Sequence, residues 1–173
     1  MTIASSSSTR SQAYRVGAAA LLLSIIVIVA ALGFEHIGGY IPCPLCLQQR
    51  WAYYLAIPML FAALALVSAE QPRLAAIVFF LVALAFLANA GLGVYQAGAE
   101  WRYWPGPDTC AGQQGLATNA GNMLEALKKT NVVRCDEAQL RIFGLSFAGW
   151  NAVLSLMLFA GAINAAFAAA ERR

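Results

Sequence analysis

Four cysteines are the residues of this chain whose type and spacing suggest chemistry. Cys43 and Cys46 form a Cys-x-x-Cys motif, and Cys110 and Cys135 follow much later in the sequence. A disulfide between Cys43 and Cys46 would close so small a ring that it would remove little entropy from the unfolded chain. The motif therefore favours thiol redox chemistry or metal binding over a structural bridge. Haem attachment would need a histidine directly after Cys46, and Leu47 stands there.

Arg50 is the charged residue expected to act together with this motif. We expect Cys46 in or beside the first turn of a helix, where the free N–H groups favour a thiolate. Arg50 follows Cys46 by four residues, so both would lie on the same helix face. The guanidinium would then stabilise the thiolate or hold the oxygen of a ligand at the edge of a bilayer. The alternative is an ordinary interfacial arginine that extends toward water.

Cys110 and Cys135 allow two interpretations. A bridge between them would close a loop of about 25 residues and could stabilise the fold by roughly 3–4 kcal/mol. The approach to Cys110, from Trp104, contains two prolines and a glycine and predicts an exposed turn. Exposed disulfides are typically the labile, catalytic kind, so these surroundings favour a redox role.

Membrane-spanning helices are the elements that must position these cysteines. The chain is 61% hydrophobic and 11% charged, whereas a soluble domain is about 25% charged. Four apolar windows come close to or reach the roughly 17–25 residues of a membrane span. They cover residues 14–34, 51–67, 74–95 and 145–169. The apolar run of the first window is too long for a cleaved signal peptide, so we interpret it as a retained helix.

The predicted fold class is therefore an all-α membrane protein. Residues 14–169 are expected to form one domain, a bundle of four transmembrane helices with a long loop, residues 96–143, between the third and fourth. Residues 1–13 are expected to be a disordered cytoplasmic tail, and residues 170–173 a second cytoplasmic tail. The sequence contains no basic run with interleaved aromatics, so nucleic-acid binding has no support.

Charge and cysteine placement predict the orientation. With four spans both termini lie on one side, which carries five arginines in short segments: Arg10, Arg15, Arg73, Arg172 and Arg173. The positive-inside rule assigns that side to the cytoplasm. All four cysteines fall on the opposite side, where disulfides persist. The cysteines are thus predicted to be periplasmic or extracellular.

A redox role for both pairs requires an electron acceptor. Gly91-Leu-Gly93 lies inside an apolar run and has Gln96 where the last glycine of a dinucleotide loop should stand. The chain has a single histidine, His36, which argues against a haem site. The remaining two-electron acceptor within reach of a membrane helix is a lipid-soluble quinone.

The residues around the cysteines resemble those of a known family. The segment Cys-Pro-Leu-Cys-Leu-Gln-Gln-Arg at residues 43–50 looks like the signature of DsbB, the disulfide bond formation protein of bacterial inner membranes. Residues 103–110 and 142–151 extend the resemblance, which covers about residues 14–169. The resemblance implies a protein-dithiol:quinone oxidoreductase whose soluble partner is a DsbA-like periplasmic thiol oxidase.

The resemblance also implies a role for each site residue. Cys110–Cys135 would be the disulfide presented to the reduced DsbA-like oxidase, with Cys110 attacked and Cys135 released. Cys135 would then attack Cys43 and free Cys46 as a thiolate. Cys46 would pass the electrons to ubiquinone or menaquinone, bound transiently with the help of Arg50.

Other interpretations stay open at this point. A vitamin K epoxide reductase-like quinone reductase also has four core helices and two cysteine pairs, but in the opposite order along the chain. A cysteine-ligated metal-binding membrane protein would have an unusual zinc pattern, because the second pair lacks Cys-x-x-Cys spacing. A scaffold with structural disulfides would tolerate loss of Cys46. The sequence assigns no role to His36, Gln96 or the serine-rich tail.

Overall fold

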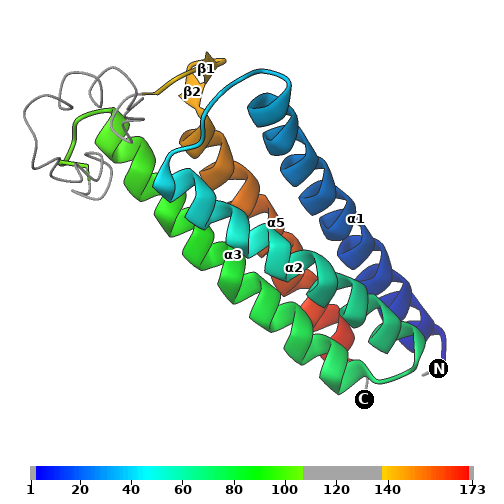
Figure 1. Cartoon of the computed structure of the whole chain (residues 1–173). Coiled ribbons are helices and arrows are strands. Elements are labelled where there is room, and N and C mark those ends of the chain that lie inside the picture. The colour runs from blue at the N-terminus through cyan, green and yellow to red at the C-terminus, as the bar shows by residue number, and fades with distance from the viewer. Residues whose placement is uncertain (1–2, 107–137, 172–173) are drawn as a thin grey trace, which may run out of the picture.

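The computed structural model describes residues 3–106 and 138–171, and this part of the chain is a bundle of long helices (Figure 1). The helices are α1 (Ile3–His36), α2 (Pro44–Ser68), α3 (Pro72–Glu100) and α5 (Phe147–Ala170). A short antiparallel hairpin, β1 (Arg141–Ile142) and β2 (Leu145–Ser146), precedes α5. All 4 helices are long and apolar enough to cross a membrane. The predicted all-α, four-helix membrane fold, with a loop between the third and fourth spans, is confirmed.

The helices are longer than the apolar windows predicted. The second predicted span began at residue 51, whereas α2 begins at Pro44, whose fixed φ suits the first helical turn. The third ended at residue 95, whereas α3 continues through the polar residues to Glu100. The fourth was placed to begin at residue 145. Instead, α5 begins at Phe147, because the Ser146 hydroxyl caps the helix by accepting from the backbone N–H of Gly149.

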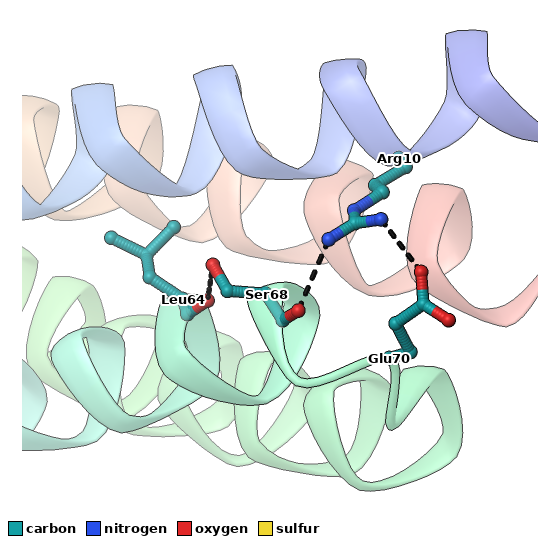
Figure 2. Close-up of polar contacts among 4 residues, drawn as sticks. All are labelled: Arg10, Leu64, Ser68 and Glu70. Carbon is teal, nitrogen blue, oxygen red and sulfur yellow. Dashed lines mark hydrogen bonds and ion pairs between the residues drawn. The ribbon is translucent and has the colours of Figure 1, made fainter.

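The predicted disordered tail, residues 1–13, is helical from Ile3 onward. Extending an existing helix adds one hydrogen bond per residue and avoids the cost of nucleation. Arg10 also fastens this extension to the turn between α2 and α3. Its guanidinium donates to Glu70 Oε1 at 2.8 Å and to the Ser68 carbonyl at 3.0 Å (Figure 2). The helical N-terminus is thus tied to the bundle by tertiary contacts that the sequence pattern does not reveal.

The bundle core is apolar and closely packed. Its largest fully buried side chains include Phe79, Phe86, Leu60 and Leu158. At Gly93 a Cβ atom would lie 3.0 Å from the backbone nitrogen of Ala152, so α3 and α5 approach closely where small residues face each other. Many large apolar side chains on the outer surface are exposed, as expected for helices that face lipid.

The two ends of the bundle differ in what they carry. Both chain termini and the α2–α3 turn lie at one end, and the α1–α2 connection and the β-hairpin lie at the other (Figure 1). The Cys43-x-x-Cys46 motif belongs to this second end, where α2 begins. Cys110 and Cys135 lie outside the described residues. Since α3 extends to Glu100, the α3–α5 connection begins later than the predicted residue 96.

Candidate active site

Cys43 and Cys46 lie in contact at the N-terminus of α2. Cys43 is the N-cap residue, and its Sγ accepts a hydrogen bond from the backbone N–H of Cys46 at 3.2 Å. The two sulfur atoms are 2.7 Å apart. Cys43 is only 3% exposed, whereas Cys46 is partly exposed. Cys46 is therefore the sulfur that a molecule at the edge of the bundle can reach.

The surroundings of the pair favour a proton on one sulfur and a negative charge on the other. The hydrogen bond to Cys46 and burial raise the pKa of the Cys43 thiol. Gln96 Nε2 lies 3.4 Å from Cys46 Sγ, and Cys46 lies in the first turn of α2, where the helix dipole favours a negative sulfur. In the reduced pair the proton therefore stays on Cys43 and the negative charge falls on Cys46.

Gln96, from α3, is a third member of the site. Its Nε2 lies 3.4 Å from Cys43 Sγ and 3.4 Å from Cys46 Sγ. The Nε2 of Gln49 donates to Gln96 Oε1 at 2.8 Å, which turns the other side of the amide toward the sulfurs. Sequence reasoning assigned nothing to Gln96, because the polar residues from Gln96 onward were expected to belong to a loop.

A chain of polar side chains, buried or partly buried, continues from the site into the bundle. Asn151 donates to Gln49 Oε1 at 2.7 Å, and the Tyr53 hydroxyl donates to Asn151 Oδ1 at 2.8 Å. Deeper still, Asn89 donates to Ser155 Oγ at 2.9 Å. These bonds join α2, α3 and α5 inside an apolar bundle, so they fix how the three helices align. The orientation of Gln96 therefore depends on all three helices.

Glu100 is a buried carboxyl group one helical turn beyond Gln96. The residue is 9% exposed, and its Oε1 lies 3.4 Å from Gln96 Nε2. Its Oε2 is also buried and has no hydrogen-bond partner within the described residues. The sequence singled out neither this carboxyl group nor Gln49. Only the packing of α3 against α2 brings Glu100 to the cysteine pair and connects Gln49 to the sulfurs through Gln96.

Arg50 is held by an acidic residue from another helix. Its guanidinium forms an ion pair and hydrogen bond with Glu35 at the end of α1. The Arg50 and Glu35 side chains are 13% and 26% exposed, so the pair is largely sheltered. Gln49, rather than Arg50, is the residue of this turn that connects to the sulfurs through Gln96. The structure thus brings Arg50 to the same end of the bundle, held between α1 and α2.

Comparison with known proteins identifies the family. Residues 14–165 match the family model described as disulfide bond formation protein DsbB. The chain belongs to the DsbB family. It is 28% identical to the disulfide bond formation protein B of Herminiimonas arsenicoxydans, over 86% of this chain and 92% of that protein. It is also 25% identical to the uncharacterized protein RP370 of Rickettsia prowazekii (strain Madrid E), over 83% of each chain. No solved structure matches the chain significantly.

DsbB membership gives the cysteine geometry a chemical meaning. The family implies a disulfide-forming oxidoreductase, and the chain is a multi-pass membrane protein with 4 candidate spans. The match favours this assignment over the vitamin K epoxide reductase-like alternative. Within the described residues, the Cys43–Cys46 pair supplies the thiols that such an enzyme requires.

Proposed function

We propose that this DsbB-family protein reoxidises a DsbA-like thiol oxidase by disulfide exchange and passes the electrons to membrane quinone. The observation that carries the proposal is the contact between Cys43 and Cys46 at the start of a membrane-crossing helix. So small a disulfide ring contributes little to stability, whereas it is well suited to opening and closing.

Disulfide exchange in this scheme begins at Cys110 and Cys135, both outside the described residues. A thiolate of the partner attacks Cys110, and Cys135 leaves. Cys135 then attacks Cys43 Sγ, the Cys43–Cys46 bond breaks, and Cys46 leaves as a thiolate. The Gln96 amide, 3.4 Å from Cys46 Sγ, and the helix dipole at the first turn of α2 stabilise that leaving group.

The residues beside Cys46 fit a quinone as the electron-accepting substrate. A guanidinium has five N–H donors, and Glu35 accepts from Nη1 of Arg50, so other donors stay available for a carbonyl oxygen. Leu47 and Trp51, from the same part of α2, are 46% and 71% exposed and offer apolar surface for the ring and the isoprenoid tail. Both ubiquinone and menaquinone satisfy this description.

The orientation proposed is the one that the charges predict. The protein would lie in a bacterial inner membrane with cytoplasmic termini and periplasmic cysteines. Both termini lie at the bundle end opposite the cysteine pair, as this orientation requires (Figure 1). Cysteine labelling from the periplasmic side with a membrane-impermeant maleimide tests it. If the reagent labels reduced Cys46 only when it is given access to the cytoplasmic side of the membrane, the proposed orientation is wrong.

The proposed activity is tested by stoichiometry. The full-length protein in detergent is mixed with a reduced DsbA-like oxidase and a ubiquinone or menaquinone analogue. We expect one quinol for each disulfide formed in the oxidase. A protein that reduces neither quinone and binds stoichiometric zinc would instead be the cysteine-ligated metal protein considered from the sequence.

A further inference from the structure

The Gln96 amide faces more acceptors than it can satisfy. Its NH₂ group has two N–H donors. Three acceptors lie at 3.4 Å from Nε2, namely Cys43 Sγ, Cys46 Sγ and Glu100 Oε1. The distribution of these two donors must therefore depend on which acceptors carry negative charge. Reduction or oxidation of the two sulfurs is thus linked, through the Gln96 amide, to the protonation state of the Glu100 carboxyl group.

The surroundings of Glu100 give its carboxylate little stabilisation when a Cys46 thiolate is also present. It is 9% exposed, and its Oε2 is buried without a hydrogen-bond partner in the described structure. The groups that face it are Cys46 from α2, Gln96 from its own helix, Ser146 from β2 and Arg141 from β1. Of these, only Arg141 is cationic, and it is exposed to solvent. The free-energy cost of a buried carboxylate whose charge is so little compensated falls when the carboxylate takes up a proton.

Reduction of the cysteine pair places a new negative charge next to Glu100. The oxidised Cys43–Cys46 disulfide is neutral, and the reduced pair carries a thiolate on Cys46. A Glu100 carboxylate and a Cys46 thiolate repel each other. Two buried groups that interact in this way titrate as a coupled pair, so one is neutral when the other is charged.

We propose that Glu100 takes up one proton when the Cys43–Cys46 disulfide is reduced and releases it when the disulfide re-forms. The buried site then holds a single negative charge in both redox states. In the oxidised state that charge is on Glu100, which accepts a hydrogen bond from the Gln96 amide. In the reduced state it is on Cys46, and the amide turns its donors to the sulfurs.

The proton and electron balance of this cycle closes. A dithiol reduces the disulfide and becomes a disulfide itself, losing two electrons and two protons. The two electrons break the Cys43–Cys46 bond, one proton goes to Cys43 Sγ, and the other goes to the Glu100 carboxylate. On reoxidation the Cys43 thiol and the Glu100 carboxyl group give up these two protons as the pair gives up two electrons, which together reduce one quinone to quinol.

Only this last step rests on the proposed function, so the test omits both the quinone and the partner oxidase. The full-length protein with Cys110→Ser and Cys135→Ser is equilibrated with a small dithiol between about pH 6 and 7.5, where ordinary thiols stay largely protonated. If Glu100 takes the second proton, no net proton is released, and the equilibrium constant is independent of pH. In Glu100→Gln that proton is released, and the constant rises tenfold per pH unit.

Two further variants keep the test decisive. Glu100→Asp retains a carboxyl group and should restore much of the pH independence. Glu171→Gln removes an exposed carboxyl group outside the site and should behave as the parent protein. A tenfold rise per pH unit in the parent protein, or a pH-independent constant in Glu100→Gln, overturns the proposal. Either result leaves the quinone reductase activity to be judged separately.

Discussion

Gln96 of α3 holds its side-chain amide 3.4 Å from the sulfur of Cys46 on α2. The same amide lies 3.4 Å from Cys43 Sγ. A pair of cysteines at a helix N-terminus would by itself have only backbone N–H groups as donors. Gln96 adds a donor from a second helix, and Gln49 orients it. The redox behaviour of the pair therefore depends on how α2 and α3 pack.

In a Glu100→Gln background, where Gln96 has no carboxylate to stabilise in the oxidised state, replacement of Gln96 by methionine should make the cysteine pair harder to reduce. The variant keeps the length of the side chain but removes the donor to the Cys46 thiolate, and a hydrogen bond to a charged group contributes about 1.5–3 kcal/mol. We expect the equilibrium with a dithiol at fixed pH to shift at least about tenfold toward the disulfide. The matched control is Gln12→Met, because Gln12 bonds to Asn164 at the exposed opposite end. An unchanged equilibrium in Gln96→Met would contradict this role.

The two thiols of the reduced pair should react with iodoacetamide at different rates. The pKa of Cys43 is raised, so its proton is retained as the pH rises past about 8.5, where an ordinary cysteine loses it. Between about pH 6 and 8 we expect Cys46 to be alkylated and Cys43 to stay unmodified. Peptide mass spectrometry after timed quenching measures this. Unfolded protein serves as the control, and equal rates in the folded protein would count against the assignment.

Arg50 and Glu35 should act as one unit toward the quinone. Removal of the guanidinium in Arg50→Ala should raise the apparent KM for quinone about tenfold, as expected for loss of one charged hydrogen bond. Glu35→Gln frees Arg50 from α1 and should raise the KM by a smaller factor. In the double variant the effect of Glu35→Gln should vanish. Fully additive effects in this cycle would show that the ion pair does not position Arg50.

Gly93 should be required for the close approach of α3 and α5. A Cβ at this position would lie 3.0–3.1 Å from backbone atoms of Ala148 and Ala152, which cannot move without moving the helix. Gly93→Ala should therefore destabilise the protein by about 1–3 kcal/mol. Thermal unfolding in detergent measures the change. Gly91→Ala is the matched control because, among the described residues outside its own turn of helix, no atom lies within 4 Å of the added Cβ. Equal loss in both variants would contradict the packing argument.

The sequence was sufficient to predict the four spans, because long apolar runs have few other interpretations in a chain with so little charge. The sequence-based prediction underestimated the lengths of α2 and α3, because polar residues stand at the start of α2 and at the end of α3. The start of α2 and the end of α3 contain Gln49, Gln96 and Glu100, which lower a hydropathy average although all three are helical and buried. Hydropathy averages treat every face of a helix alike, and these side chains point into the bundle.

The sequence was also sufficient to select the Cys43-x-x-Cys46 motif and the family. It could not supply the partners of these residues. Arg50 was expected beside Cys46 from helical spacing alone, but its pairing with Glu35 requires α1 to dock against α2. Likewise, nothing in the sequence around Gln96 indicates that its amide faces two sulfurs contributed by another helix.

The most direct test of the proposed electron path is whether electrons leave the protein through Cys46. Anaerobic quinone absorbance is followed after mixing a reduced DsbA-like oxidase with the wild type or with Cys46→Ser. We expect quinone reduction by the wild type and none by Cys46→Ser. Quinone reduction at the wild-type rate by Cys46→Ser, or none by the wild type with either ubiquinone or menaquinone analogues, would contradict this path.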